Sequence, residues 1–403
     1  MNEKELLEKI CPTQQERDKV NELVKEYTDV LEKRIKEKGI HAEVCLTGSM
    51  AKDTWISGDR NIDLFLIFSH DYSEQQLKRY GLDIGKISEY EIAYAEHPYV
   101  RNYVNGYEID VVPAYRFREG IRSSVDRTPL HTEYVKTHLK DRNQVRLLKK
   151  FVRSIGVYGS DLKVQGFSGY LCELLVIRYG SFMNVLEAAA DWKKGDPLFL
   201  EDFTQHFDEP LIFVDPVDPE RNVAAVLSEE NLTKFIYSSR EFLRNPDPSY
   251  FFKEPERYTR ILNTQLYRID FTVNLIDDIL FPQLRKTRDF LVKELERNDF
   301  QVFNTAIFYS GILLELSVFE LPPLTNHLGP PIWEREHCER FLKKHERIGV
   351  HRDKLCAIVT RKHATAEDLL KTLLISRKGF GKDLAKAEAH VNRIPGDIDV
   401  LIY

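Results

Sequence analysis

The residues most able to do chemistry in this 403-residue chain are small and acidic side chains within residues 46–68 and near residue 110. The segment LTGSMAKDTWISGDRNIDLFLIF carries Gly48 and Ser49 at the end of one expected strand, and Asn61 and Asp63 at the start of the next. Glycine permits close approach of the backbone, and exposed N–H groups beside it can hold phosphate oxygens. A Gly-Ser pair is weak evidence alone, so its meaning depends on the carboxylates that follow it.

Asp63 and Asp110 are the carboxylates that could share a cation. Residues i and i+2 of a strand project to one face, so Asn61 and Asp63 should point the same way. Asp110 ends another apolar stretch, and it joins them if the two strands are neighbours. Mg²⁺ suits clustered carboxylate oxygens, and two such ions can stabilise the attacking and leaving oxygens of an in-line displacement. A lone aspartate at a strand end is usually a solvated terminus, but the combination favours a metal site.

The elements that must position these residues can be predicted from hydrophobic spacing. A helix is expected over 13–38, because apolar residues recur at helical spacing, Thr13 can cap it and Gly39 can stop it. A helix or turn should follow Gly48. The Asn105-Gly106 pair predicts a hairpin, and Pro113 is expected to end its second strand. The strands expected here span 42–46, 62–68, 99–104 and 107–112.

The rest of the chain is predicted to be helical at first and to combine helices and strands afterwards. Proline clusters at 210–219 and 246–255 suggest linkers or domain edges. The strand, helix and paired strands that follow resemble a small α+β sandwich, and 321–331 is expected to be a proline-rich loop. The expected helices are 142–152, 168–179, 281–298 and 366–374, and the expected strands are 269–275, 300–319 and 397–402.

Bulk properties restrict the class of protein. No apolar run approaches the length of a membrane span, the first ten residues lack the apolar core of a signal peptide, and the five cysteines are scattered, so we expect a cytosolic protein with reduced thiols. The net charge of −6 argues against non-specific coating of nucleic acid. Residues 361–393 nevertheless hold eight Lys or Arg against four acids. An RNA contact or a solvated helix face explains that stretch equally well.

The signature GSMAKDTWISGDRNIDLFLIF resembles that of archaeal-type (class I) CCA-adding enzymes, which belong to the DNA polymerase β-like nucleotidyltransferases. The resemblance continues through SSVDRTPLHTEYV (123–135), RLLKKFVRSIGVYGSDLKVQGFSGYLCELLVIRYGSF (146–182) and VDPVDPERNVAA (214–225). It is specific over 40–230. It implies an α+β multidomain chain: a catalytic head (1–140), a mainly helical central nucleotide-pocket domain (141–255) and a small ferredoxin- or RRM-like α+β body and tail that binds tRNA (256–403).

The same resemblance assigns site residues. Asp63 and Asp110 fall on catalytic metal ligands, and Lys52 stands where arginine is more usual, which keeps the charge but loses bidentate geometry. Arg221 falls on the arginine that helps to distinguish C and A from G and U. Taken singly, His131, Lys149, Tyr158 and Arg221 would more often be ordinary structural or surface residues. The positions that line the nucleotide site are Gly48, Ser49, Lys52, Thr128, His131, Lys149, Tyr158 and Arg221.

Position 61 departs from the family, which has Asp or Glu where this chain has Asn61. An amide oxygen is a neutral and poorer Mg²⁺ ligand, so metal occupancy and catalysis should suffer. Three explanations stay open on the sequence. The chain could be a deliberately inactivated variant, an active enzyme that uses Asn61 with other ligands such as Asp59, or a natural non-catalytic RNA-binding relative.

The activity implied is template-free addition of C, C and A to the 3′ end of tRNA. CTP and ATP would be the substrates, two Mg²⁺ ions the cofactors, and pyrophosphate the leaving product. The acceptor stem and TΨC arm of tRNA would be the partner, with homodimer formation left open and no membrane involved. The alternatives are a poly(A) polymerase or oligoadenylate synthetase-like enzyme, which would use ATP alone, and a pseudo-enzyme that binds tRNA without extending it.

Overall fold

The computed structural model divides into two compact units, residues 1–254 and 255–403. Each unit is described here by itself. No helix within the described residues is long and apolar enough to cross a membrane. The structure describes residues 3–94, 97–117, 124–201, 205–252, 257–258, 261, 263–395 and 398–401.

The first unit contains a five-stranded sheet in the order β1-β2-β5-β4-β3. Its central pair, β2 and β5, is parallel, whereas the other neighbours are antiparallel. The parallel pairing sets Asn61 level with Glu108 and Asp63 level with Asp110. The two strands predicted to carry the carboxylates are therefore direct neighbours. The strands are β1 (Ala42–Thr47), β2 (Asn61–Phe68), β3 (Glu89–Tyr94), β4 (Pro98–Val104) and β5 (Tyr107–Tyr115).

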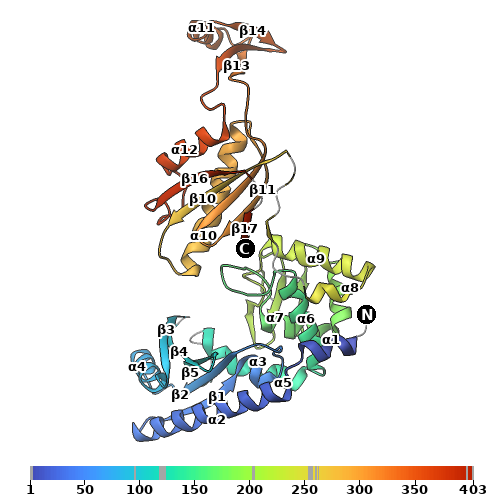
Figure 1. The fold of residues 1–403 in the computed structure, drawn as a ribbon, viewed down its shortest axis with the longest axis vertical. Helices are drawn as coiled ribbons and strands as arrows, with labels where there is room; N and C mark the ends of the chain where they lie inside the picture. The colour runs from blue at the N-terminus through green and yellow to red at the C-terminus, as the bar shows by residue number, and fades with distance from the viewer. Residues whose placement is uncertain are drawn as a thin grey trace. The chain divides into compact units, whose positions relative to one another are not determined.

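Helices cover one face of this sheet, and α2 (Gln14–Glu37) runs along it (Figure 1). Thr13 caps α2 in a capping box with Glu16, and Gly39 follows its end at a φ of +64°, which confirms the predicted helix. Alternate residues of β2 pack against α2 and α4 (Glu74–Gly85), because side chains of a strand alternate between faces. Asn61 and Asp63 consequently project from the opposite face.

The predicted hairpin at Asn105-Gly106 joins β4 to β5, and both turn residues have positive φ, as a tight hairpin turn requires. Pro113 does not end β5, contrary to the prediction. The strand continues to Tyr115 through its parallel pairing with β2, while pairing with β4 has already stopped at Val111. The proline therefore removes no hydrogen bond on the β4 side.

A helical core follows the sheet in the same unit. It includes Phe151, Phe167 and Phe235, together with Leu6 and Ile10 of the N-terminal helix α1 (Glu3–Ile10), which the sequence analysis does not predict. The helices predicted from residues 142 and 168 are both present, and Ser168 caps the second of them. The helices of this region are α5 (Thr128–His138), α6 (Arg142–Ser154), α7 (Gly169–Tyr179), α8 (Phe182–Ala189) and α9 (Glu229–Arg244).

Three short strands, β6 (Pro197–Leu198), β7 (Ile212–Asp215) and β8 (Asp218–Asn222), form a small sheet beside these helices. It lies partly within the proline-containing stretch 210–219, for which the sequence predicts a linker or domain edge. That reading is wrong for β7, whose residues are all buried. The turn between β7 and β8 brings Asp215 and Arg221 together, which matters for the site below.

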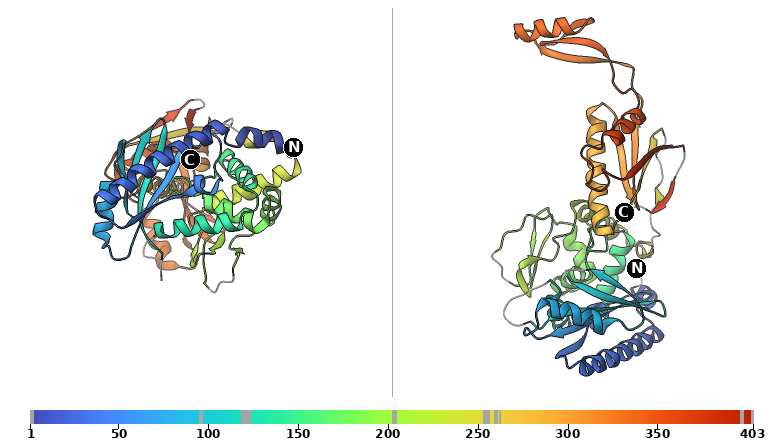
Figure 2. Two further views of the ribbon diagram at one scale, coloured as in Figure 1. Left: turned by 90° about the horizontal axis from the view of Figure 1, so that it is seen from below. Right: turned by 90° about the vertical axis from the view of Figure 1, so that its left-hand side faces the viewer.

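The second unit is built on a four-stranded antiparallel sheet in the order β11-β12-β10-β16, with α10 and α12 on one face (Figure 2). The strand, helix, two strands, helix and strand follow one another along the chain, apart from an insertion after β12. The predicted order is thus observed, although β10 lies four residues earlier than expected and β16 was missed. The elements are β10 (Gln265–Thr272), α10 (Asp277–Arg297), β11 (Gln301–Phe308), β12 (Gly311–Val318), α12 (Ala366–Ser376) and β16 (Glu388–Ile394).

The expected loop at 321–331 is mostly a strand, β13 (Leu324–Pro331), and the prediction was wrong because the prolines lie at an edge. Among the residues described, β13 pairs only with β15 (Lys354–Thr360), and the pairing is irregular between Leu328 and Pro331, which is where proline is tolerated in a sheet. A small core beside it is formed by α11 (Arg335–Lys344) and β15, with Ile348 of β14 (Ile348–His351) packed against it. The last strand, β17 (Ile398–Leu401), pairs with β9 (Arg257–Tyr258); its predicted ends, Asp397 and Ile402, lie outside the described residues.

Candidate active site

The carboxylates predicted to share a cation lie together on the face of the sheet away from α2. We call Asn61, Asp63, Glu108, Asp110 and Arg101 the carboxylate face. Burial, reinforced by the negative charge of Asp110, raises the pKa of Asp63 to about 6. Asp110 instead receives two hydrogen bonds from the guanidinium of Arg101, at 2.8 and 2.9 Å. Two carboxylates are thus close enough for their charges to interact, and one arginine neutralises only part of that charge.

Gly48 meets this face at the start of α3 (Gly48–Lys52). Its φ is +69°, and a Cβ atom there would lie 1.9 Å from Oδ2 of Asp63. Any other residue would therefore be strained and would also collide with the carboxylate. Ser49 follows on the same short helix and is half-buried. The backbone of the predicted phosphate segment thus lies directly against the predicted metal ligand.

Lys52 and Lys149 are brought together by Glu173, a residue that sequence reasoning missed. We call Lys52, Thr54, Lys149 and Glu173 the lysine cluster. Glu173 is fully buried and accepts hydrogen bonds from Lys52 at 2.5 Å and Lys149 at 3.0 Å, and another from Thr54 Oγ. Burial alone would raise the pKa of Glu173, but the two lysine charges and these hydrogen bonds lower it to about 2. One carboxylate therefore faces two ammonium groups in a buried place.

The lysine cluster is continuous with Tyr158. The ideal Cβ position of Gly169, at the start of α7, lies 3.0 Å from Oη of Tyr158 and 3.5 Å from Nζ of Lys149. The absence of a side chain at Gly169 lets these two polar groups converge. Arg153 lies over the Tyr158 ring, 4.4 Å from its centre. Tyr158 is thus half-buried: it packs against the apolar core of the unit, and its hydroxyl lies on the side of Lys149.

Asp59, considered from the sequence as a substitute metal ligand, lies elsewhere. It precedes β2 and is paired with Arg153 of α6 at 2.6 Å. It also accepts a hydrogen bond from the backbone N–H of Ile56. Asp59 therefore precedes the strand, and the prediction that it shares the strand face of Asp63 is wrong.

A second polar cluster consists of His131, Tyr170, Asp215 and Arg221, and we call it the histidine–arginine cluster. The buried Asp215 carboxylate contacts His131 Nε2 and Arg221 Nη1, each at 2.8 Å, and accepts a hydrogen bond from Tyr170 at 3.1 Å. The His131 ring stacks on Tyr170 with centres 3.9 Å apart. Burial lowers the pKa of His131, although Asp215 opposes that effect. Sequence reasoning missed Asp215 and Tyr170.

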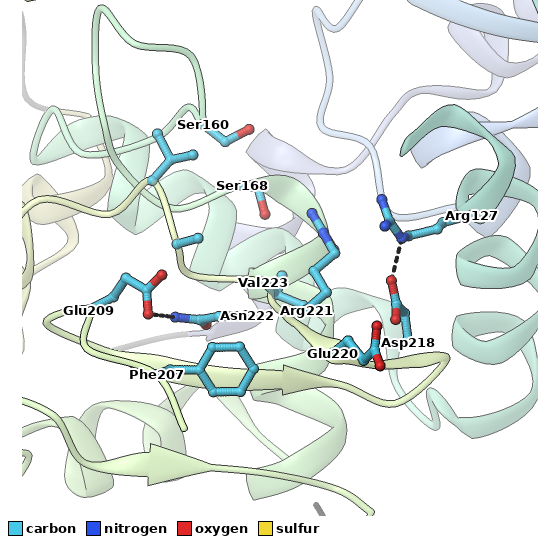
Figure 3. A pocket seen from close by; sticks show the side chains of 12 residues that line it. Arg127, Ser160, Ser168, Phe207, Glu209, Asp218, Glu220, Arg221, Asn222 and Val223 are labelled. Atoms are coloured by element: carbon cyan, nitrogen blue, oxygen red, sulfur yellow. Dashed lines mark hydrogen bonds and ion pairs between the residues drawn. The ribbon is translucent and has the colours of Figure 1, made fainter. Parts of the chain in front are cut away.

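Arg221 also lines a pocket of about 570 Å³ within the first unit (Figure 3). Ser168 and the ion pair of Arg127 with Asp218, at 2.6 Å, line the same pocket. Arg221 keeps 36% of its side-chain surface exposed although it is paired with Asp215. It is therefore an oriented donor at a cavity rather than a solvated surface arginine. Thr128 begins α5, one turn before His131.

These groups form one connected arrangement. Lys52 Nζ lies 5.7 Å from the centre of the Tyr170 ring, and its charge also acts on Asp63. Lys52 thus links the carboxylate face, the lysine cluster and the histidine–arginine cluster. All eleven residues predicted for the site lie in the first unit and are described. Their roles toward a nucleotide remain predictions.

The donor set of the carboxylate face suits a divalent cation. Nothing in the described part of the chain donates a hydrogen bond to the Asp63 carboxylate, and burial together with the like charge of Asp110 raises its pKa. Oxygen ligands of this kind favour a hard cation. As the side chains stand, no three His, Cys, Asp or Glu residues among those described are arranged to hold an ion. Two aspartates and neutral oxygens are the ligands in place, so a third carboxylate would have to move.

Comparison with known proteins identifies the family. Family models match as "nucleotidyltransferase domain" over 29–135, "tRNA nucleotidyltransferase, second domain" over 143–252 and "CCA-adding enzyme, C-terminal domain" over 262–393. The fold resembles that of the Cid1 poly(U) polymerase with Mg and 3′-dATP bound, with a TM-score of 0.50 at 13% identity over 62% of this chain and 97% of that one.

Two curated relatives extend the match to nearly the whole chain. The CCA-adding enzyme of Methanocaldococcus jannaschii is 39% identical, over 92% of this chain and 90% of its own length. That of Methanothermobacter thermautotrophicus is 42% identical, over 94% of this chain and 92% of its own length. With its polymerase β-like nucleotidyltransferase head, this chain belongs to the family of CCA-adding enzymes.

Proposed function

We propose that this chain adds C, C and A to the 3′ end of tRNA without a template, using CTP and ATP and releasing pyrophosphate. The observation that carries the proposal is the in-register pairing of Asp63 with Asp110 beside Gly48, with Lys52 next to them. Such an arrangement offers cation ligands and phosphate-binding charge within one site. Family membership supplies the nucleotide class and the acceptor.

Asp63 and Asp110 would be ligands of divalent cations, and we propose that two Mg²⁺ ions bind. Bound divalent ions supply charge neutralisation at the phosphates and at the attacking oxygen. Ser49, Lys52, Lys149 and Tyr158 would hold the triphosphate in position. Positioning and charge complementarity account for most of the rate in phosphoryl-type transfer, so these residues need no covalent role.

The histidine–arginine cluster is the best candidate for choosing the base. Arg221 and His131 are held by one buried carboxylate, Asp215, so their donors have fixed directions. Fixed, partly desolvated donors reject a base edge that leaves them unpaired. The pocket lined by Arg221 adjoins this cluster and would take the base, with Thr128 beside it on α5.

The second unit would bind the acceptor stem and TΨC arm of tRNA. Its strand order and alternation of elements fit a ferredoxin-like domain, and RNA duplexes are recognised by shape and backbone contacts. We further propose a head (1–140) and a central domain (141–255), which together correspond to the first unit within one residue. Homodimer formation stays a prediction. The need for CTP and ATP favours the cytosol as the compartment of the protein.

The test is incubation of the protein with tRNA lacking its 3′ CCA, Mg²⁺ and each labelled nucleotide in turn. The proposal predicts incorporation of CMP into that tRNA, and of AMP only after two cytidines. Incorporation of AMP alone on any RNA end would favour a poly(A) polymerase-like enzyme. Binding of tRNA and nucleotide without incorporation would indicate a non-catalytic relative.

A further inference from the structure

Asn61 leaves the carboxylate face one acid short of the family pattern, and the structure places another acid beside it. Glu108 is level with Asn61 in the parallel pairing of β2 and β5, as Asp110 is level with Asp63. Residues at paired positions of neighbouring strands project from the same face. Glu108 and Asp110 are also two residues apart on β5, so all four side chains share that face.

The contact between Glu108 and Asn61 is direct. Nδ2 of Asn61 donates a hydrogen bond of 3.0 Å to Oε2 of Glu108. A carboxylate oxygen of Glu108 therefore lies next to the place where the terminal oxygen of an acidic residue 61 would be. Because a carboxylate accepts only from the amide nitrogen, the hydrogen bond also turns the carbonyl oxygen of Asn61 away from Glu108. That oxygen is free to act as a neutral ligand.

We propose that Glu108 is a metal ligand that replaces the acidic residue missing at position 61. The inference rests on the proposed metal-dependent transfer at Asp63 and Asp110. The negative charge that the family carries on β2 is carried here on β5, one strand across. Asn61 becomes the residue that orients the Glu108 carboxylate rather than the residue that disables the site.

Glu108 has the freedom that this role requires. Its side chain is 38% exposed, whereas that of Asp110 is 12% exposed and held by Arg101. Rotation about its side-chain bonds can bring the Glu108 carboxylate towards Asp63 without moving the backbone. Arg101 Nε lies 3.7 Å from Glu108 Oε2, so the same guanidinium faces both acids of β5. The three carboxylates of the carboxylate face share one guanidinium, which also lies 4.0 Å from Glu91 of β3, and the excess negative charge is what a divalent cation would neutralise.

The experiment measures Mn²⁺ affinity by electron paramagnetic resonance, using the full chain with a non-hydrolysable CTP analogue. Glu108→Gln is expected to weaken Mn²⁺ binding about 10- to 100-fold, the range seen when groups supporting a metal site are removed. Glu91→Gln is the matched control, because Glu91 is an exposed acid on β3 that lies 4.0 Å from the same Arg101. Its Mn²⁺ affinity should stay within a few-fold of the unsubstituted chain.

The decisive variant returns the acid to β2. Asn61→Asp combined with Glu108→Gln should recover Mn²⁺ affinity to within a few-fold, which a general loss of charge or folding would not allow. If Glu108→Gln binds Mn²⁺ as tightly as Glu91→Gln does, Glu108 is not a ligand. Asp63→Asn distinguishes failure of this inference from failure of the proposed metal site. If Asp63→Asn also leaves Mn²⁺ binding unchanged, the proposed metal site itself fails. If Asp63→Asn weakens Mn²⁺ binding and Glu108→Gln does not, only the role of Glu108 is overturned.

Discussion

The carboxylate face and the lysine cluster lie in the same unit and are out of charge balance in opposite directions. In the lysine cluster one buried carboxylate, Glu173, faces Lys52 and Lys149. On the carboxylate face, Asp63, Glu108 and Asp110 face one guanidinium, that of Arg101. A triphosphate would balance the excess positive charge of the lysine cluster, and a divalent cation would balance the excess negative charge of the carboxylate face. Under the proposed function, one metal–nucleotide complex would balance both.

The two regions also differ in how they are held. The lysine cluster is buried and hydrogen-bonded at every group, so it should be rigid and should matter for folding as well as for binding. The carboxylate face is partly open, and Glu108 can rotate. Ligands that must enter and leave suit the open region. Substitutions should therefore cost stability in the first region and function in the second.

Glu173→Gln should produce the largest loss of stability, because it leaves two buried lysines facing a neutral amide. Removing one partner of a buried ion pair typically costs about 3–5 kcal/mol. Urea unfolding at pH 7 measures this, with Glu187→Gln on the exposed face of α8 as the control, expected within about 0.5 kcal/mol of the unsubstituted chain. A loss no greater than the control's would mean that the lysine cluster does not stabilise the fold.

The same variant gives a pH dependence with a definite sign. The folded pKa of Glu173 lies below its usual 4.5, at about 2, so its stabilising contribution is present above pH 4.5 and is lost as the pH falls through that range. The difference in unfolding free energy between the unsubstituted chain and Glu173→Gln should therefore shrink below pH 4.5. A difference that grows on acidification would contradict the pairing with the two lysines.

Asp63→Asn should act on catalysis instead. It removes an anionic ligand while leaving the fold and the lysine cluster intact, so CMP incorporation should fall at least about 100-fold, the upper range for loss of a supporting group. Single-turnover incorporation on tRNA lacking CCA measures the rate, and thermal unfolding checks the fold. A near-normal rate would remove Asp63 from the metal site.

Arg221→Ala should relax the choice of base with a smaller effect on rate. Removing an oriented donor typically shifts discrimination by about 1–3 kcal/mol. The ratio of kcat/KM for CTP to that for UTP is the measurement, and Arg127→Ala on the same pocket serves for comparison. An unchanged ratio for Arg221→Ala would place base selection elsewhere.

Arg101→Gln, on the carboxylate face, should give the smallest effect. Without Arg101 the repulsion between the carboxylates is no longer offset, so the free energy of unfolding of the metal-free chain should fall by about 1–2 kcal/mol. Mn²⁺ should then bind more tightly, and it should restore part of the lost stability, because a ligand of the folded state stabilises it. Thermal unfolding with and without Mn²⁺ tests this, and equal losses in both would show that Arg101 does not compete with the cation.

Much of the carboxylate face could be predicted from local sequence, whereas the lysine cluster could not. Asn61, Asp63 and Asp110 were placed on one face because strand alternation and the Asn105-Gly106 turn are local signals. The pairing of Lys52 with Lys149 depends on Glu173, more than a hundred residues from Lys52. A glutamate within the apolar run GYLCELLVIRY was the available signal, since a buried acid needs partners.

Other misses have equally physical causes. Glu108 looked like an ordinary alternating strand residue, and only the register of β2 with β5 set it beside Asn61. The strand β13 was read as a loop because its edge position, which tolerates proline, is a property of the sheet and not of the segment. Asp215 depends on the turn between β7 and β8, which brings Arg221 back to it.

The central claim is that the carboxylate face and the lysine cluster bind the cation and the phosphates of one complex. Its most direct test is the coupling between metal binding and nucleotide binding. Calorimetry would measure the affinity of the chain for CTP with EDTA and with Mn²⁺, and repeat both for Asp63→Asn and Glu187→Gln. The account predicts that Mn²⁺ tightens CTP binding about tenfold or more in the unsubstituted chain and in Glu187→Gln, a coupling of about 1–3 kcal/mol, and not in Asp63→Asn. Equal CTP affinity with and without Mn²⁺ in the unsubstituted chain would contradict it.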